Sequence, residues 1–287
     1  MNLNYLRACP IGCDGPLQVT EIEMPEGPLL RCAGCGQLVS QCSEDKYRQS
    51  MREFNTTGGT QPRPDALRRR FDRSRKYLEQ IEKILRKPRS EIRLLDVGCS
   101  SGYFLSVAHQ LGFYAEGVEP GEEAVKTARA AGLAVHEGLL KDVVLPEQSF
   151  DAITLFEVIE HLKDAGDAIQ RCNRLLRPGG ILVIGTANTA SWTFMAMKSR
   201  WEYFHIDKHG GHISFFNSFS MKMLADRSGF VTEKIQTRSV RFFEKDVCHP
   251  VIYRTFKIIS ELIEAPSRWL GKGHDMLVFM RKVKTVN

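Results

Sequence analysis

The residues best suited to chemistry begin with a glycine-spaced turn, in which Asp96, Gly98 and Gly102 belong to the run LLDVGCSSGYF. This run is typical of a strand that ends in an acid and passes through a tight turn into a helix. A dinucleotide fold needs glycines at the second and third positions of G-x-G-x-x-G, so that the backbone approaches a pyrophosphate. Ser100 and Tyr103 occupy those positions here, which argues against a dinucleotide.

The same turn suits a cofactor that carries a positive charge and no phosphate. Asp96 would repel a phosphate but attract an ammonium group. Glu119 ends the second expected strand, where an acid can accept hydrogen bonds from ribose hydroxyls. S-adenosylmethionine has a cationic amino-acid end and a ribose, so the sequence predicts an S-adenosylmethionine site at the ends of these two strands.

Two further segments offer groups that could act on a methyl acceptor, because a hydroxyl must lose its proton as it attacks. FEVIEHL places Glu157, Glu160 and His161 just past the fourth expected strand. His161 could be a base or a substrate contact, and a divalent ion such as Mg²⁺ on this segment is the less favoured alternative. FHIDKHGGHISFF offers His209 and His212, which could act as bases, bind a metal or simply pack.

Four cysteines near the start of the chain have the spacing of a metal site. Cys9 and Cys13 form one pair, and Cys32 and Cys35 form another. A structural zinc site takes four such ligands, whereas a chain with no secretory signal is not expected to build a disulfide framework. We predict structural zinc on these four thiols, with Cys42 as a substitute ligand and an iron–sulfur cluster as the main competitor.

An alternating series of strands and helices must hold these groups. The strand-like runs are IRLLDV, YAEGVE, LAVHE, FDAITLF, ILVIGT, VTEKIQT and DMLVFMRK. Helical runs near 103–111, 122–131 and 164–176 alternate with the first five, with none between LAVHE and FDAITLF, which predicts a parallel sheet with helices on both faces. We expect an α/β fold: a doubly wound, mostly parallel, seven-stranded Rossmann-like sheet with a small amino-terminal zinc-ribbon-like module.

Residues 91–186 resemble the class I S-adenosylmethionine-dependent methyltransferases. LLDVGCSSGYF is similar to their first motif, GVEP to the ribose-binding acid, SFDAITLFEVIEHL to the fourth strand and LLRPGGILVIGT to the turn into the fifth. LLRCAGCG, HISFF and GKGHDMLVFMRK extend the resemblance over nearly the whole chain. They are similar to a subgroup with an amino-terminal four-cysteine module and a HxxFF segment, encoded among glycan and natural-product biosynthesis genes.

The resemblance implies a set of site residues. At the cofactor it implies or is compatible with Asp96, Gly98, Cys99, Ser100, Gly102, Glu119, Pro120, Leu139, Phe156 and Glu157. Leu139 stands where the family has an acid beside the adenine, so the backbone or Asp142 is expected to read the adenine amine. His212 falls at the HxxFF histidine near the methyl donor, and we expect it to be the base or substrate-orienting residue, with His209 beside it.

We expect three segments: a zinc-binding module at 1–45, a linker and basic helix at 46–90, and a methyltransferase domain at 91–287. The 43% apolar and 26% charged composition is ordinary for a soluble protein, and no run has the length of a membrane span or a signal core. A cytoplasmic location is therefore expected. The basic stretch at 63–89 is interpreted as a solvated helix face, and the amphipathic stretch at 251–264 leaves peripheral membrane contact open.

The expected function is methyl transfer from S-adenosylmethionine to a small molecule, a sugar or a lipid-linked glycan, first at oxygen and otherwise at carbon. An RNA methyltransferase that uses the zinc module to bind RNA is one alternative. The chain lacks a strong basic–aromatic stripe, so a nucleic acid partner is disfavoured. A non-catalytic scaffold that keeps the cofactor fold is the other alternative. The sequence does not determine the oligomeric state.

Overall fold

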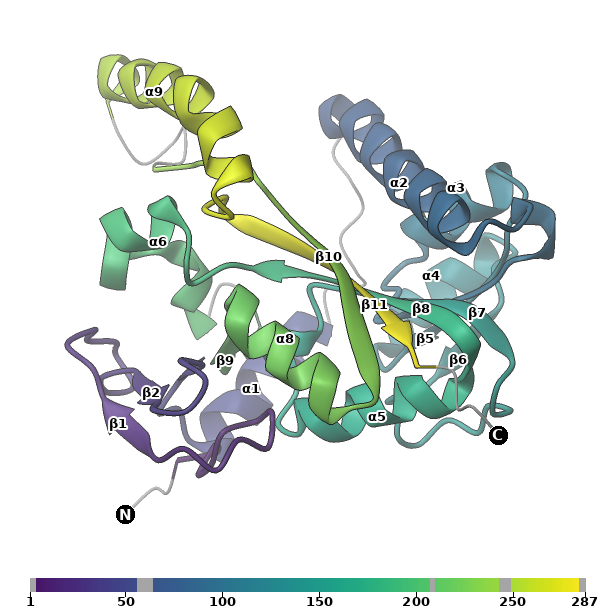
Figure 1. Cartoon of the computed structure of the whole chain (residues 1–287), viewed down its shortest axis with the longest axis horizontal. Coiled ribbons are helices and arrows are strands. Elements are labelled where there is room, and N and C mark those ends of the chain that lie inside the picture. Colours follow the sequence, from purple (N-terminus) through teal and green to yellow (C-terminus); the bar gives the residue numbers. More distant parts are fainter. Residues whose placement is uncertain (1–3, 56–63, 207–209, 243–248, 284–287) are drawn as a thin grey trace.

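The computed structural model describes residues 4–55, 64–206, 210–242 and 249–283 (Figure 1). Its main sheet has seven strands in the order β10-β11-β8-β7-β4-β5-β6, which confirms the expected fold class. From β8 to β6 neighbouring strands are parallel, whereas β11 runs antiparallel to both β8 and β10. The strands are β4 (Arg93–Val97), β5 (Tyr114–Glu119), β6 (Val135–Glu137), β7 (Phe150–Phe156), β8 (Leu176–Ala187), β10 (Phe230–Arg238) and β11 (Asp275–Lys282).

Helices cover both faces of this sheet because its central strands are apolar on both sides. Leu94 of β4 packs into the core beneath α2, α3 and α4, while Leu95 packs into the core beneath α5 and α8. Because β8, β7, β4, β5 and β6 are parallel, their carboxyl ends all lie at one edge of the sheet, where a doubly wound fold binds its ligands. The helices are α2 (Pro64–Leu85), α3 (Tyr103–Gln110), α4 (Glu122–Ala130), α5 (Ala165–Leu175) and α8 (Ser218–Arg227).

A second, small sheet holds the amino-terminal segment. It has the order β1-β2-β3-β9, with all pairs antiparallel. The first three strands are β1 (Leu17–Val19), β2 (Leu30–Cys32) and β3 (Leu38–Val39), whereas β9 (Ser214–Phe215) comes from far along the chain. Helix α1 (Glu44–Asn55) follows β3, and short 3₁₀ turns lie at Arg89–Glu91, Ile159–His161, Lys198–Arg200 and Glu202–Phe204.

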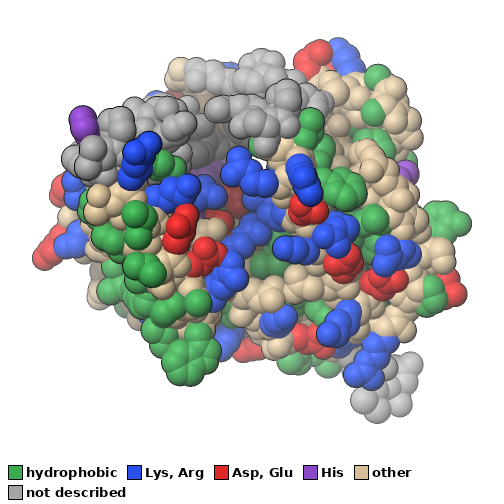
Figure 2. All heavy atoms as spheres, turned by 90° about the horizontal axis from the view of Figure 1, so that it is seen from above, with side chains coloured by type: hydrophobic (Ala, Val, Ile, Leu, Met, Phe, Trp, Pro, Cys, Tyr) green, Lys and Arg blue, Asp and Glu red, His purple; other side chains and the backbone are tan. Residues whose placement is uncertain are grey.

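Two helices rise from the same side of the molecule, α2 and α9 (Pro250–Trp269), and α6 (Trp192–Met197) lies below α9 (Figure 1). Seen from above, Lys and Arg side chains gather around a hollow in the middle of this face (Figure 2). Helix α9 packs against β10 but leaves Ile258 58% and Leu262 74% exposed. Within the described residues, no helix combines the length and apolarity needed to cross a bilayer.

Candidate active site

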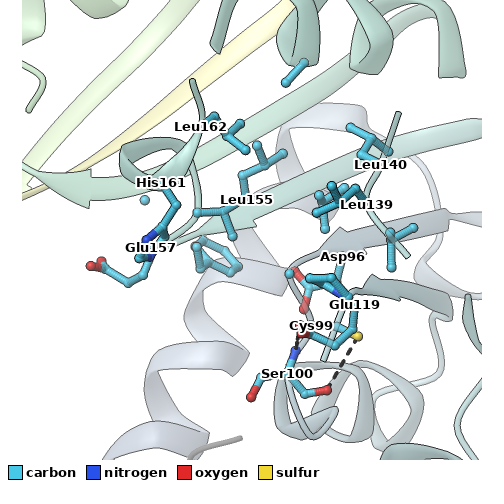
Figure 3. Close-up of a pocket in the computed structure, with 18 of the residues that line it drawn as sticks. Asp96, Cys99, Ser100, Glu119, Leu139, Leu140, Leu155, Glu157, His161 and Leu162 are labelled. Carbon is cyan, nitrogen blue, oxygen red and sulfur yellow. Dashed lines mark hydrogen bonds between the residues drawn. The ribbon is translucent and has the colours of Figure 1, made fainter. Parts of the chain in front are cut away.

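One cavity of about 1190 Å³ lies at the carboxyl ends of β4, β5 and β7, and residues of α1 and α2 also line it. Figure 3 shows part of its lining. Ligand pockets commonly measure about 300–1,000 Å³, so this cavity has room for a cofactor and part of a second ligand. It is lined by every residue predicted to bind the cofactor except Gly102.

Two buried carboxylates, Asp96 and Glu119, lie together at one end of the cavity (Figure 3). Glu119 accepts hydrogen bonds from the backbone N–H groups of Ser100 at 2.9 Å and Gly121 at 2.8 Å, which fix it at the tip of β5. The Thr154 hydroxyl donates a hydrogen bond to Asp96 at 2.6 Å. Burial raises the pKa of Asp96 to about 7, with a smaller contribution from Glu119, and burial also raises the pKa of Glu119. A bound cation would stabilise this carboxylate pair.

The glycine turn between β4 and α3 depends on close packing as well as on access to the cavity. Gly98 has a φ of 74° and Gly102 a φ of 82°, in the left-handed region that favours glycine. A Cβ atom on Gly98 would lie 2.4 Å from Val158 Cγ2, and one on Gly102 would lie 2.3 Å from Leu133 Cδ1. Gly102 therefore serves the packing of α3 rather than the cavity wall.

Three aromatic side chains that contact one another line the cavity. Phe156 ends β7, and its ring stacks on Tyr77 of α2 at 5.3 Å and meets Phe104 edge to face at 5.0 Å. The guanidinium of Arg238 lies 5.2 Å from the centroid of the Tyr77 ring. The resemblance implied Phe156 at the cofactor, whereas Tyr77 was not among the predicted site residues. Its place at i+4 from Arg73 and i+7 from Arg70 is the signal that could have put it on a ligand-facing stripe.

Glu157 and His161 lie at the other end of the cavity (Figure 3). Glu157 has a φ of 55°, a left-handed conformation that is uncommon for a residue other than glycine. The Tyr47 hydroxyl donates a hydrogen bond to the His161 carbonyl oxygen at 2.9 Å, which ties α1 to this end. Burial lowers the pKa of His161, against the opposing charge of Glu160. The imidazole is therefore neutral near pH 7 and able to accept a proton.

The side chain of His212 packs against His161 but does not line the cavity. Its ring meets the His161 ring at 4.7 Å, its Nδ1 lies 2.9 Å from the Tyr203 carbonyl oxygen, and its Nε2 lies 3.8 Å from Glu160 Oε1. Glu160 is fully buried and accepts hydrogen bonds from the hydroxyls of Tyr203 and, at 3.1 Å, Thr186. The ligating atoms of Glu160, His161 and His212 all lie within 4.8 Å of one another, an arrangement that could hold a metal ion.

The three histidines predicted to be catalytic occupy different positions. His161 is part of the cavity wall, whereas His212 is 4% exposed and stands outside the set of lining residues. His209 lies outside the described residues. Glu160 and His161 belong to one predicted candidate segment and His212 to another, and the fold brings these three side chains into one cluster. Tyr203, which links Glu160 to His212, was missed because nothing in its local sequence marks it.

Basic side chains of α2 also face the cavity. Arg70 and Arg73 line it one helical turn apart, on the same stripe as Ser74 and Tyr77. Neither arginine forms an ion pair with a residue that the structure describes, whereas Arg75, on another side of α2, pairs with Glu79 at 2.7 Å. Burial lowers the pKa of Arg70, with a smaller effect from Arg73. Arg70 is partly buried and lies 5.2 Å from the centroid of the Tyr103 ring, whereas Arg73 is exposed, and both could meet an anionic ligand group bound in the cavity.

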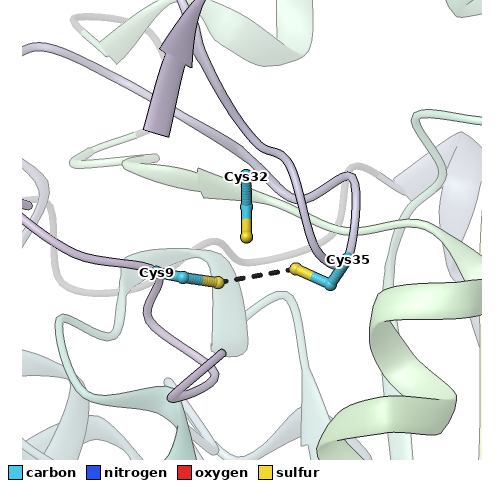
Figure 4. Close-up of side chains that lie close together, drawn as sticks. All are labelled: Cys9, Cys32 and Cys35. Atoms are coloured by element: carbon cyan, nitrogen blue, oxygen red, sulfur yellow. Dashed lines mark hydrogen bonds between the residues drawn. The ribbon is translucent and has the colours of Figure 1, made fainter. Parts of the chain in front are cut away.

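The amino-terminal cysteines converge as a metal site requires. The Sγ atoms of Cys9 and Cys35 lie 3.5 Å apart, and those of Cys13 and Cys32 lie 3.6 Å apart. The sulfur atoms of Cys9, Cys32 and Cys35 point toward one another, all within 4.8 Å (Figure 4). A disulfide needs about 2.05 Å, whereas zinc–sulfur bonds of about 2.3 Å in a tetrahedron place sulfur atoms about 3.8 Å apart. The thiols therefore fit a zinc ion better than a disulfide.

Glycines allow the chain to turn tightly around these thiols. The Gly36 N–H donates to the Cys32 carbonyl oxygen at 2.9 Å, and Gly36 has a φ of 70°. A Cβ atom on Gly34 would lie 2.5 Å from Cys13 Sγ, so only glycine fits there. Neither Cys13 nor Cys42 belongs to the group of three thiols within 4.8 Å, although Cys13 Sγ lies 3.6 Å from Cys32 Sγ. Cys42 is buried in the same module.

A family model described as a methyltransferase domain matches residues 68–235. Among curated proteins, the ubiquinone biosynthesis O-methyltransferase of Rhodopseudomonas palustris (strain TIE-1) is 30% identical over 138 residues, which cover 46% of this chain and 51% of that protein. The ubiquinone biosynthesis O-methyltransferase of Caulobacter sp. (strain K31) is 35% identical over 112 residues, covering 36% and 44%. The chain thus spans about half the length of the curated relatives that it matches.

Solved structures share the fold. A SAM dependent methyltransferase from Archaeoglobus fulgidus has a TM-score of 0.51 at 20% identity, covering 73% of this chain and 94% of that one. A SAM-dependent methyltransferase from Thermotoga maritima has a TM-score of 0.50 at 21% identity, covering 83% and 99%. At these identities the likeness concerns the fold alone.

Proposed function

The chain belongs to the methyltransferase-domain family that matches its residues 68–235, and on this premise we propose that it moves a methyl group from S-adenosylmethionine to a hydroxyl oxygen of a small molecule or sugar. The observation that carries the proposal is the arrangement of one cavity. Asp96 and Glu119 lie at one end, and His161 and Glu157 lie at the other. Such a cavity can hold a cationic donor and an acceptor that loses a proton.

The carboxylate end suits the donor. Asp96 binds the ammonium group of the donor, and Glu119 accepts hydrogen bonds from its ribose hydroxyls. The positive charge of the ammonium group lowers the free-energy cost of burying two acids side by side. The aromatic rings of Phe156 and Tyr77 lie next to this site, where a ring face attracts a sulfonium cation. The carboxylate of the donor fits Arg70 and Arg73, the two cations of α2 that face the cavity.

His161 is the group that we assign to the acceptor proton. As the acceptor oxygen attacks the methyl carbon, the carbon–sulfur bond breaks and the O–H proton passes to a ring nitrogen of His161. S-adenosylhomocysteine and the methyl ether are the products. The burial that lowers the pKa of His161 keeps the ring neutral and ready to accept this proton. The ring of His212 packs against the ring of His161, and a carboxylate oxygen of Glu160 lies within 4.8 Å of a ring nitrogen of each.

A second assignment for this end is a divalent cation, favoured by the convergence of Glu160, His161 and His212. The two histidines and the carboxylate suit a transition-metal ion, and Glu157 on the cavity wall could add a second carboxylate. When bound, the ion would acidify an acceptor hydroxyl. Addition of EDTA to purified protein, with methyl transfer and metal content measured together, separates this assignment from proton transfer to His161 alone.

The cysteine module is assigned a structural zinc ion. Cys9, Cys13, Cys32 and Cys35 supply four thiolates, and a closed four-thiolate site leaves no position for a water molecule. The module therefore stabilises the amino-terminal segment and takes no part in methyl transfer itself.

The names of the relatives favour oxygen as the accepting atom, because both are ubiquinone biosynthesis O-methyltransferases. Within that class we propose a small-molecule, sugar or lipid-linked glycan acceptor. To test this, the purified protein is incubated with host extract and S-adenosylmethionine tritiated at its methyl group. The extract is then divided into RNA, glycan-plus-lipid and small-metabolite fractions, and the label in each is counted. The variant D96N is the control, since it weakens donor binding and should abolish the label in every fraction.

Label in the glycan, lipid or metabolite fraction supports the proposal and supplies a compound whose mass identifies the acceptor. Nuclease-sensitive label in the RNA fraction overturns the acceptor class and assigns the cysteine module to RNA binding. Binding of S-adenosylmethionine with no transfer to any fraction overturns the enzymatic proposal in favour of a scaffold.

A further inference from the structure

The small amino-terminal sheet is completed by a strand from the acceptor end of the cavity. Strand β9 pairs antiparallel with β3, so that Leu38 faces Phe215 and Val39 faces Ser214. Next to this pairing, the Ser40 N–H donates a hydrogen bond to the Ile213 carbonyl oxygen at 2.9 Å. The backbone directly after His212 is therefore held by the module that contains the cysteines.

A side chain extends this contact to the cysteine turn itself. The Asn217 Nδ2 atom donates a hydrogen bond to the carbonyl oxygen of Gly36, the residue after Cys35, at 3.2 Å. The Oδ1 atom of Asn217 accepts from the backbone N–H groups of Phe219 and Ser220, each at 2.9 Å, and caps α8. One amide thus joins the cysteine turn to the segment that carries β9.

The same backbone continues to the cavity wall. The Ile213 N–H donates to the Glu160 carbonyl oxygen at 3.0 Å, so Ile213 is bonded to the module on one side and to Glu160 on the other. Tyr47, in the helix that follows the module, bonds the carbonyl oxygen of His161 at 2.9 Å. Both histidines at this end of the cavity are therefore anchored to the amino-terminal segment through neighbouring backbone.

We propose that the metal site of the cysteine module positions the acceptor end of the active site, by holding residues 36–40 as the template on which residues 212–217 are ordered. This inference rests on the zinc site and the methyl transfer proposed above. It assigns Asn217 and Ser40 as positioning residues for His212 and His161, although neither side chain contacts the cavity.

The backbone pairing between these segments is short, although Leu38 shares one hydrophobic cluster with Phe215 and Val39 shares another with Ile213. Strands β3 and β9 have two residues each, and strands this short are not stable by themselves. A zinc ion held by Cys9, Cys13, Cys32 and Cys35 would fix the turn that precedes β3. When the turn is released, the N–H of Ser40 and the carbonyl of Ile213 lose their partners, and the segment behind His161 is free to move.

The test uses three variants of the full chain and amide hydrogen exchange followed by mass spectrometry. N217D is isosteric and keeps the cap of α8, but a carboxylate cannot donate to the Gly36 carbonyl. N217A loses both the cap and the donor, and so separates the two roles of the side chain. C35S removes one thiolate, and C42S is its matched control in the same module. Zinc content and S-adenosylhomocysteine affinity are measured on each protein.

In N217D, exchange of the 212–216 amides should accelerate by about tenfold, the size expected for the loss of roughly one hydrogen bond. Zinc content and S-adenosylhomocysteine affinity should stay within about twofold of the parent protein, because the carboxylate end of the cavity is untouched. C35S should lose zinc and accelerate the same amides further, whereas C42S should do neither. The affinity for S-adenosylhomocysteine also shows whether the main sheet of each variant is folded.

Unchanged exchange at 212–216 in both N217D and zinc-free C35S overturns the inference. A parent protein that purifies without zinc and shows slow exchange at 212–216 also overturns it, because the template would then stand without a metal. If exchange behaves as expected but no acceptor is methylated in any fraction, the proposed function fails and the coupling between the two sites stands.

Discussion

The ring of His161 meets the ring of His212 edge to face with centroids 4.7 Å apart, although the two residues belong to segments that are far apart in the sequence. Only His161 lines the cavity, while His212 is held by the Tyr203 carbonyl oxygen and faces Glu160. The pair therefore consists of one ring that can reach a ligand and one that fixes its orientation. This difference gives the two residues separable effects on catalysis.

Replacing His161 by alanine should lower kcat by about 10²- to 10⁴-fold, the usual contribution of a positioned general base. H212N should lower kcat by only about tenfold, because it loosens the ring of His161 without removing the proton acceptor. Steady-state kinetics on the labelled acceptor measure both. Affinity for S-adenosylhomocysteine serves as the control and should not change in either variant. The reverse order of effects would make His212 the base, as the sequence suggested.

The affinity for the donor should depend on pH through Asp96. Its pKa is raised to about 7 in the free protein, so the group is protonated below that value and loses the charge that attracts the ammonium group. Binding should weaken by about tenfold as the pH falls from 7.5 to 6, since the α-amino group of the ligand keeps its own proton below about 7.7.

Calorimetric titration with S-adenosylhomocysteine at several pH values measures this dependence. D96N should bind weakly at every pH and show a flat profile. A parent protein with a flat profile over the same range would contradict the role assigned to Asp96.

Gly102 should be needed for stability rather than for contact with the cofactor. It shares a left-handed backbone with Gly132, whose φ is 78°, but a Cβ atom on Gly132 has no neighbour within 4 Å. G132A should therefore lower the free energy of unfolding by about 1 kcal/mol, through backbone strain alone. G102A adds a clash with Leu133 and should cost about 2–4 kcal/mol. Chemical denaturation measures both, and equal losses would show that Leu133 moves aside.

The carboxylate end of the cavity, to which we assign the cofactor, is formed by residues that the sequence already groups together, because its information is local. A buried apolar run, an acid at the strand tip and glycines in the next turn are neighbours in the chain, so one short segment defines both the strand and the ligand site. The run YAEGVE was expected as a strand, and β5 has the same bounds, Tyr114–Glu119. The seven-stranded order follows from the same alternation of strands and helices.

The acceptor end could not be assembled in this way because its contacts are non-local. Strand β9 has two residues and is defined only by its pairing with β3, which no local pattern indicates. Helix α1 is polar along most of its length, so Tyr47 carried no sign that it would reach the backbone of His161. The sequence therefore supplied the two histidine segments as separate candidates, and only the fold joins them.

The basic run on α2 was interpreted as a solvated face, and the structure divides it. Arg68 and Arg69 are exposed and stand outside the set of cavity-lining residues, whereas Arg70 and Arg73 line the cavity. Arg70 and Arg73 are three residues apart and so share a helix face, although Arg73 is exposed, like Arg68 and Arg69. The helix therefore offers two pairs of arginines with equal charge and different surroundings.

The double variant R70Q/R73Q should weaken S-adenosylhomocysteine binding by about 10- to 100-fold, as expected for the loss of charge-assisted hydrogen bonds to the ligand carboxylate. R68Q/R69Q changes the net charge of the protein by the same amount and should leave the affinity within about twofold. Calorimetry at two salt concentrations distinguishes a direct contact between the arginines and the ligand from long-range attraction by the net positive charge of the helix. Salt largely screens only the long-range attraction. If both double variants weaken binding equally, the α2 arginines act through their summed charge. If R70Q/R73Q alone raises the KM of the acceptor while donor affinity is unchanged, the two arginines bind the acceptor instead.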